Sequence, residues 1–344
     1  DLDRLSDSWN AKSCNEVFRV GFRQTLLATF YDAGHLLGSA GVMLESESGH
    51  TVFYTGDVQF ENQSMIPGAD FPESGVDTLI MECTRGGFQR SAHYSRPEEM
   101  VRFGQAIADT LERGGAVLIP VFAIGKSQEM LFNIHRFKQQ GEIPANTPEN
   151  YVGQSTKVTL LYARISGLPR RHDLDFKLKE EIQTVPLPRK GKAPLVCTPG
   201  NIYVVSSGMM TEKTLSNVMA EQVLPHEKNA ILFVGYADPD SPAGQLKTTP
   251  HGELVKMRPN GQPVRRKCTI DCFDFSGHAT RDSLVDYAVK LKPKQVILVH
   301  GDPDAVEWMH DTLAFRMPDA EIIAPVPGNR YTFDSRASPD REKA

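Results

Sequence analysis

Short apolar runs separated by turn-forming residues dominate the first 85 positions of the chain. The run at residues 25–31 (TLLATFY) ends in the turn-like DAGH, and the runs at residues 41–45 and 51–55 flank the polar segment ESESGH. Compact apolar runs bounded by Gly, Asp and Ser are typical of β-strands. The pattern therefore predicts a strand, then a hairpin, and a further short buried strand at residues 77–81.

The pattern changes after residue 96. Residues 97–113 place apolar side chains at helical spacing behind a proline, which predicts a helix. A strand at residues 116–121 and a helix at residues 125–139 follow, and this alternation favours a parallel sheet. The remaining expected elements are strands at 158–162, 202–206, 230–234, 268–275, 295–299 and 321–325, and helices at 280–291 and 305–315.

Two polar stretches stand out from this regular pattern. Residues 169–192 hold seven Lys or Arg against four Asp or Glu, and residues 256–267 (KMRPNGQPVRRK) are basic without any acid. Each stretch is either a solvated surface loop or a contact for a phosphate backbone.

The overall composition narrows the class of protein. With 344 residues, 40% hydrophobic and 24% charged, the chain is globular and long enough for two domains or one domain with a large insertion. The net charge of −5 argues against a globally basic nucleic-acid binder but allows a local basic groove. No stretch approaches the ~18 apolar residues of a membrane span. Five scattered cysteines without a C-x-x-C pair indicate a reducing, cytoplasmic location.

Four apolar strands are each followed by a side chain that can bind a metal. These side chains are His35, Asp57, His278 and His300, and each lies beside a glycine. A single histidine in such a place is more often a structural hydrogen-bonding group. Because strand ends carry the active sites of open α/β sheets, four together predict a hydrolytic metal site. Imidazole nitrogen and carboxylate oxygen are ligands that Zn²⁺ accepts.

An ordered set of motifs extends this pattern along nearly the whole chain. DAGHLLGSA, YTGD, IMECT, IPVFAIGKSQE, VVSSGMM, FSGHAT and ILVHGD resemble, in this order, the metallo-β-lactamase fold carrying a β-CASP insertion. This group of RNA-processing nucleases includes the endonuclease subunit of the pre-mRNA 3′-end cleavage complex and archaeal and bacterial relatives. The resemblance implies an α/β fold, namely an N-terminally incomplete αββα sandwich (residues 1–86 and 277–344) with an inserted α/β β-CASP domain (residues 87–276).

The resemblance also implies roles for individual residues. His35 matches a ligand of the first zinc, Asp57 matches the carboxylate that bridges two zincs, and His300 matches a ligand of the second. His278 matches a histidine that donates a proton to the leaving group, and Glu82 matches its acidic partner.

The resemblance further points to side chains that contact RNA. Ser206 and Ser207 lie in the matching SSGMM motif, and Lys126 lies in the matching IPVFAIGKSQE segment. Arg96, with His93 nearby, fits the segment that follows the acidic motif. The segment at Lys126 could instead serve only to begin a helix.

Two residues bear on the nature of the substrate. The DNA-directed branch of the superfamily generally lacks a histidine where His278 stands, so this residue favours RNA. Tyr236, in FVGYADPDSPAGQL, is expected to be a core side chain, with stacking on an RNA base as the alternative.

The strongest motif of the family, His-x-His-x-Asp-His, does not occur in the sequence. Two explanations compete: the chain is a fragment of a complete enzyme, or it is a naturally degenerate homologue. The start at Asp1 and the retention of all five candidate site residues favour the fragment.

The sequence therefore predicts a zinc-dependent RNA phosphodiester hydrolase, an endonuclease for which exonuclease activity is also open. A complete member would hold two zincs, and this chain alone is expected to be inactive. A catalytically inactive β-CASP homologue that binds RNA or acts as a scaffold is the alternative. A metallo-hydrolase of small molecules fits less well, because such enzymes need no second lobe. RNA is the expected partner, no membrane is expected, and a homodimer remains open.

Overall fold

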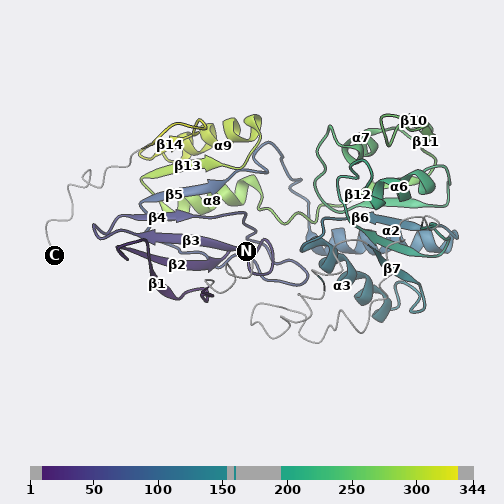
Figure 1. The fold of residues 1–344 in the computed structure, drawn as a ribbon, viewed down its shortest axis with the longest axis horizontal. Helices are drawn as coiled ribbons and strands as arrows, with labels where there is room; N and C mark the ends of the chain where they lie inside the picture. The colour runs from purple at the N-terminus through teal and green to yellow at the C-terminus, as the bar shows by residue number, and fades with distance from the viewer. Residues whose placement is uncertain (1–9, 153–158, 160–194, 332–344) are drawn as a thin grey trace. The chain divides into compact units, whose positions relative to one another are not determined.

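The computed structural model describes residues 10–152, 159 and 195–331 (Figure 1). The chain forms two compact units. Unit 1 comprises Asp1–Asn62, Gly68–Arg90 and Gly277–Ala344, and unit 2 comprises Gln63–Pro67 and Ser91–Ser276. The expected strand at 158–162, apart from residue 159, and the basic stretch at 169–192 lie outside the described residues.

Unit 1 contains one mixed sheet of seven strands, in the order β1-β2-β3-β4-β5-β13-β14. Strands β1 to β4 pair antiparallel in sequence order, whereas β4, β5, β13 and β14 pair parallel. Strand β2 therefore runs in the same direction as β4, β5 and β13, and all four end at one edge of the sheet. The strands are β1 (Val17–Val20), β2 (Leu26–Asp32), β3 (Ala40–Glu45), β4 (Thr51–Tyr54), β5 (Thr78–Glu82), β13 (Gln295–Val299) and β14 (Glu321–Ile323).

Helices α8 (Arg281–Leu291) and α9 (Pro303–Arg316) share a core with this sheet. Leu79 and Met81 alternate along β5, so they point to the same face, and both are fully buried. They belong to the same buried cluster as Leu284 of α8 and Leu313 of α9. The packing fixes the central strands whose ends carry the candidate site.

Unit 2 is built around a five-stranded parallel sheet in the order β12-β9-β6-β8-β7. The strands are β6 (Val117–Pro120), β7 (Glu149–Val152), β8 (Ile202–Val205), β9 (Ala230–Phe233) and β12 (Thr269–Cys272). The described helices are α2 (Arg96–Glu112), α3 (Lys126–Gln139), α6 (Leu215–Val223) and α7 (Pro242–Thr248), and a small hairpin joins β10 (Leu254–Val255) to β11 (Val264–Arg265).

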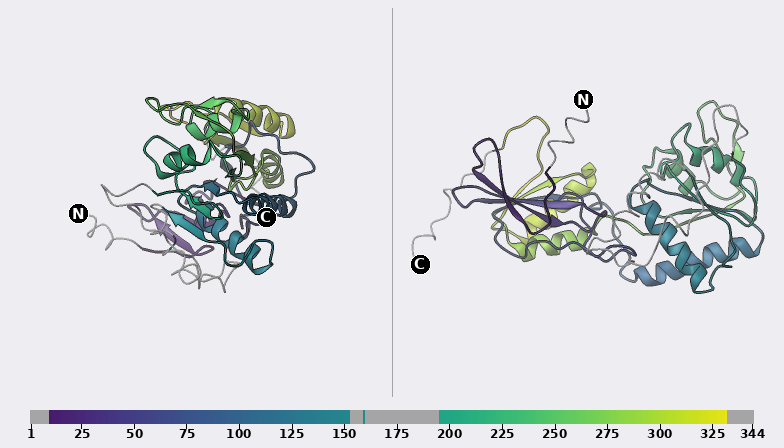
Figure 2. Two further views of the ribbon diagram at one scale, coloured as in Figure 1. Left: turned by 90° about the vertical axis from the view of Figure 1, so that its right-hand side faces the viewer. Right: turned by 60° about the horizontal axis from the view of Figure 1, so that its bottom comes forward.

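Helices cover both faces of the unit 2 sheet. Leu118 of β6 and Val205 of β8 share a buried cluster with Met219 of α6. Val117 and Ile119 alternate with Leu118, so they point to the opposite face. Helices α2 and α3, the blue helices of Figure 2, contact the sheet there. Unit 2 thus contains a parallel sheet, as the strand–helix alternation predicted, and helices cover both of its faces.

The mixed α/β class predicted from the sequence is confirmed, and the described strands and helices agree with their expected ranges within a few residues. The expected strand at 268–275 is shorter, since β12 ends at Cys272. Strands β1, β7, β10 and β11 and helices α6 and α7 were not predicted. Among the described residues, no helix is both long enough and apolar enough to span a bilayer.

A buried carboxylate, Glu129, connects three segments of unit 2. Its side chain is 4% exposed and accepts hydrogen bonds at 2.5 Å from both Arg96 and Lys126. It also accepts from the backbone N–H of Ser64 at 3.0 Å. Burial alone would raise the pKa of Glu129, but Lys126 and Arg96 lower it to about 2. The start of α2, the start of α3 and the segment at Ser64 are therefore held together by one ionised group.

We expect Glu129→Gln to destabilise the protein by about 3–5 kcal/mol, because it leaves two buried cations without their anion. The folded-state pKa lies below the ordinary 4.5, so the stabilisation is present above pH 4.5 and is lost as the pH falls towards 2. Urea denaturation from pH 7 to pH 2.5 should show a wild-type advantage that shrinks below pH 4.5. The exposed Glu212→Gln is the control, and a loss below about 1 kcal/mol at pH 7 for Glu129→Gln would contradict the expectation.

Candidate active site

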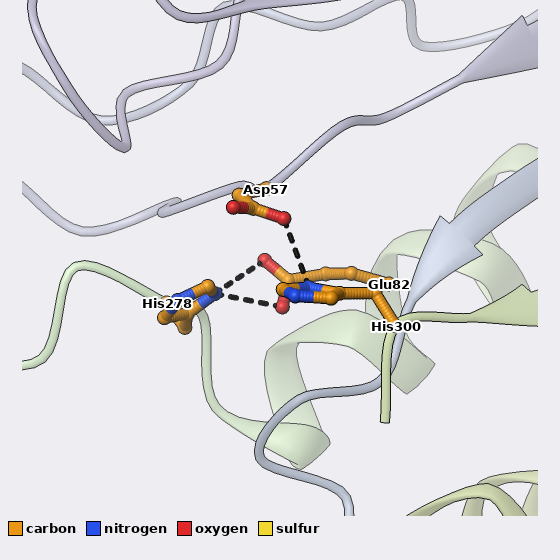
Figure 3. Close-up of side chains that lie close together, drawn as sticks. All are labelled: Asp57, Glu82, His278 and His300. Atoms are coloured by element: carbon orange, nitrogen blue, oxygen red, sulfur yellow. Dashed lines mark hydrogen bonds and ion pairs between the residues drawn. The ribbon is translucent and has the colours of Figure 1, made fainter. Parts of the chain in front are cut away.

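The ends of the unit 1 strands bring the sequence-selected side chains together (Figure 3). Asp57 follows β4, Glu82 ends β5, His300 follows β13, and His278 precedes α8. One ligand-type atom from each of these four lies within 4.8 Å of the others. His35, which follows β2, places its Nε2 3.8 Å from Asp57 Oδ2. The parallel arrangement of the strands is therefore what assembles residues from distant parts of the sequence.

Glu82 and His278 form a carboxylate–imidazole pair. His278 Nδ1 lies 2.9 Å and 3.1 Å from the two carboxylate oxygens, and Glu82 is 1% exposed. Burial alone would raise the pKa of Glu82, but His278, the Thr84 hydroxyl and the Val58 N–H hold it below its usual value. Since an ionised carboxylate only accepts hydrogen bonds, His278 carries its proton on Nδ1. The second ring nitrogen, Nε2, is then the one that can carry a transferable proton.

His35 has the protonation pattern of a metal ligand. Its Nδ1 donates to the backbone carbonyl of Gly277 at 2.7 Å, which turns Nε2 towards Asp57. Burial and the neighbouring His278 lower the pKa of His35, so its imidazole is neutral near pH 7. A neutral ring whose other nitrogen is tied to a backbone carbonyl is the usual form of a zinc-binding histidine.

His300 is held in an unusual backbone conformation, with φ of +53°. The next residue, Gly301, packs so closely on Cys83 that a Cβ there would lie 2.6 Å from the thiol sulfur. His300 Nδ1 lies 3.0 Å from both Asp57 Oδ1 and Thr84 Oγ1. Because the carboxylate accepts, the Nδ1 carries the proton, which leaves Nε2 as the nitrogen with the lone pair.

Thr84 is a site residue that the sequence analysis missed. Glu82 ends β5 and Thr84 begins the turn that follows it, and the two side chains are hydrogen-bonded to each other, whereas Cys83 between them is fully buried. The Thr84 hydroxyl donates to Glu82 and lies within hydrogen-bonding distance of the His300 ring and carbonyl. It therefore bridges the proton-transfer pair and a metal-type histidine. A hydroxyl gives no sequence pattern of its own, so the sequence held no signal for this residue.

The donor set fits zinc at three positions. His35, Asp57 and His300 offer imidazole nitrogen and carboxylate oxygen, the donors of hydrolytic zinc sites. Glu82 fits less well as a ligand, because Val58, His278 and Thr84 already engage its carboxylate.

The side chains predicted to bind substrate lie in unit 2. Lys126 and Arg96 both contact Glu129. Ser207 exchanges hydrogen bonds with Ser216, through its N–H at 3.2 Å and its carbonyl at 2.7 Å. Ser206 is half-buried beside it. The role of these four residues in binding RNA stays a prediction.

The expectation that Tyr236 is a core residue is wrong. Its side chain is 59% exposed, because it lies on the loop beyond the end of β9 and not on the strand itself. Cys83 is fully buried.

Two family models match the chain. A model described as "Zn-dependent metallo-hydrolase RNA specificity domain" matches residues 263–325, and one described as "Beta-Casp domain" matches residues 127–246. The first range ends in unit 1 and includes His278 and His300.

Several curated relatives resemble the chain over most of its length. Transcription termination factor FttA of Methanocaldococcus jannaschii is 28% identical and covers 84% of this chain. Cleavage and polyadenylation specificity factor subunit 3 of Dictyostelium discoideum is 26% identical over 94%, and Endoribonuclease YSH1 of Candida glabrata is 26% identical over 89%. The chain spans only 47%, 42% and 41% of these relatives, respectively.

A solved structure shares the fold alone. The crystal structure of a protein of unknown function from Enterococcus faecalis V583 has a TM-score of 0.50 at 13% sequence identity. The match covers 93% of this chain and 66% of the Enterococcus faecalis chain.

The mixed sheet, the inserted parallel sheet and the imidazole and carboxylate groups at the strand ends agree with the metallo-hydrolase class that the family model describes. The chain belongs to the β-CASP metallo-β-lactamase family.

We expect Thr84→Val to weaken Zn²⁺ binding by roughly 10- to 100-fold, because it removes the hydroxyl that orients His300 without changing the side-chain shape. Thr84→Ser should restore the affinity. The measurements are competition titration with a zinc chelator and ¹⁵N NMR of the His300 ring, whose Nδ1–H form should lose population in Thr84→Val.

Thr55→Val is the matched control, since the Thr55 hydroxyl contacts only backbone groups near the site. An unchanged zinc affinity in Thr84→Val, or an equal loss in Thr55→Val, would show that Thr84 does not position His300.

Proposed function

We propose that unit 1 carries the proton-transfer half of a zinc-dependent ribonuclease site, which hydrolyses internal RNA phosphodiester bonds. The observation that supports this most directly is the buried Glu82–His278 pair, at 2.9 Å, beside three zinc-type donors. A carboxylate-held imidazole next to a metal site can both bind a phosphodiester and protonate the oxygen that leaves it.

Each residue has a distinct task in this proposal. His278 holds a proton on Nε2 for the leaving oxygen, and Glu82 fixes the ring through Nδ1. His35, Asp57 and His300 would hold zinc, which would lower the pKa of a water molecule and neutralise charge on the phosphate. A complete site with two zincs needs donors beyond these three.

The nature of the substrate is supported by the comparisons. One matching family model is described as an RNA specificity domain, and one relative is named an endoribonuclease. We therefore propose RNA as the polymer that the site cleaves, with endonucleolytic attack as the main mode and exonuclease activity as a further possibility.

A second candidate function is an RNA-binding or scaffold subunit without catalysis. The observation that favours it is the absence of His-x-His-x-Asp-His from the 344 residues. The two candidates differ in whether the existing donors hold zinc and whether His278 acts on RNA.

We expect the 344-residue chain by itself to bind at most one zinc, weakly, and to cleave RNA negligibly, because three donors do not complete two catalytic sites. Metal analysis after gel filtration and a cleavage assay with labelled single-stranded RNA provide the measurements. Two tightly held zincs, or cleavage at the rate of a longer chain that contains the histidine motif, would contradict the assigned donor set.

His278→Ala and His300→Ala should separate proton transfer from metal binding. In a chain that also carries the histidine motif, His278→Ala should lower kcat by roughly 10²–10⁴-fold and leave the zinc content unchanged. His300→Ala should lose zinc as well as activity. A substrate with a better leaving group needs less protonation, so it should rescue His278→Ala far more than His300→Ala.

The zinc comparison can be made on the 344-residue chain alone, without activity. Equal metal loss in both variants would show that His278 is a ligand. If the substrate with the better leaving group does not rescue His278→Ala selectively, His278 is not the proton donor.

A further inference from the structure

Unit 2 contains a small open pocket that the proposed zinc chemistry does not use. Its lining includes Phe122, Lys126, Gly208, Gly235 and Tyr236, and its empty volume is about 240 Å³. This volume includes space open to solvent, so the pocket is a shallow depression at the surface and not an enclosed cavity.

The pocket lies where the topology of the sheet reverses. The chain leaves β6 through α3 towards β7 and β8, and it leaves β8 through α6 to reach β9 on the other side of β6. Phe122, Gly208 and Tyr236 follow the carboxyl ends of β6, β8 and β9, respectively. Open α/β sheets bind ligands at such a point, because adjacent loops there diverge to opposite faces.

Two aromatic side chains of this pocket are exposed to an unusual degree. Tyr236 is 59% and Phe122 is 43% exposed, although buried apolar strands lie directly before both residues. Gly208 keeps Phe122 in place, since a Cβ at position 208 would lie 3.3 Å from the Phe122 nitrogen. Lys247 holds the other loop through a 2.7 Å hydrogen bond to the Gly235 carbonyl. The rings are therefore presented to solvent by fixed loops.

The charges around the pocket favour an uncharged ligand over a phosphate. Lys126 is the lining residue with a formal charge, and its ammonium group is 2.5 Å from Glu129 and 3.3 Å from Gln63. Its cationic charge is thus compensated within unit 2, and the remaining lining is aromatic, aliphatic or glycine.

We propose that this pocket binds one unpaired RNA base, which stacks on Tyr236 and Phe122. The proposal rests on RNA as the substrate and assigns unit 2 a stacking site for a single-stranded segment. Stacking on aromatic rings tolerates any base, because every base has a π-face. The pocket therefore selects single-stranded over double-stranded RNA without reading a sequence.

Two variants of the full chain test the pocket from opposite directions. Tyr236→Ala removes a stacking surface. Gly235→Leu fills the pocket, and it does so without a clash at Cβ, since a Cβ at Gly235 meets no atom within 4 Å. Tyr236→Phe keeps the ring and is the conservative control. Phe315→Ala removes a still more exposed aromatic ring from α9 of unit 1 and is the matched control.

The probe is a single-stranded oligouridine of about 12 nucleotides with one 2-aminopurine, together with an abasic strand of equal length. Fluorescence anisotropy gives Kd, and quenching of 2-aminopurine reports stacking. We expect Tyr236→Ala and Gly235→Leu to raise Kd for the base-containing strand by roughly 5- to 100-fold and to abolish quenching. Both controls should bind like wild type. The abasic strand should bind all variants equally and more weakly than the normal strand binds wild type.

The outcomes separate the pocket from the proposed function. If wild type binds RNA with unchanged affinity and quenching in Tyr236→Ala and Gly235→Leu, the pocket is not a base site, while RNA as the substrate stands. If wild type prefers the abasic strand or binds both strands equally, the base-stacking proposal is overturned. If wild type binds neither strand, both the pocket and RNA as the substrate are overturned, whereas zinc binding by unit 1 is judged by its own measurement.

Discussion

The carboxylate of Glu82 is the group on which the candidate site depends. It is nearly inaccessible to water and ends a central strand. Its hydrogen-bond donors must therefore come from the protein itself. The Val58 N–H comes from the loop after β4, His278 from the segment before α8, and Thr84 from the continuation of β5 towards His300. A single buried anion thus fixes three loops relative to one another. An apolar residue in its place would leave these donors without an acceptor.

The sequence predicted most of the fold because apolar periodicity is strong where both faces of a strand are buried. Strands β6, β8 and β9 are uniformly buried, and their apolar runs are continuous. Strand β1 escaped prediction because VFRV lies at a sheet edge, where its side chains are only half-covered. Helix α6 escaped it because its polar side chains Ser216 and Asn217 are buried. Asn217 is satisfied by the carbonyls of Met210 and Met257, a tertiary arrangement that no local pattern reveals.

The candidate site was predictable as far as the residue types themselves suggest chemistry. Histidines and carboxylates after apolar strands indicated a metal site, and the structure brings His35, Asp57, Glu82, His278 and His300 together. Thr84 was missed because the role of its hydroxyl depends on Glu82 and His300, which become its neighbours only in the folded chain. The exposure of Tyr236 was mispredicted because apolar context in the sequence continues past the point where β9 stops. For both Thr84 and Tyr236, the sequence did not reveal where the preceding strand ends in three dimensions.

The wide separation of the paired residues has a consequence for the order of folding during synthesis. Glu82 and His278 are 196 positions apart, and β5 pairs with β13 across a similar span. The sheet of unit 1 therefore lacks strand β13 until residue 299 has emerged from the ribosome, whereas all of unit 2 has emerged by residue 276. Domains fold as units as they emerge, so the inserted unit can be native while the strands around it still lack their central partner. During that interval β5 has an open edge, and the cell must protect it from pairing with other chains.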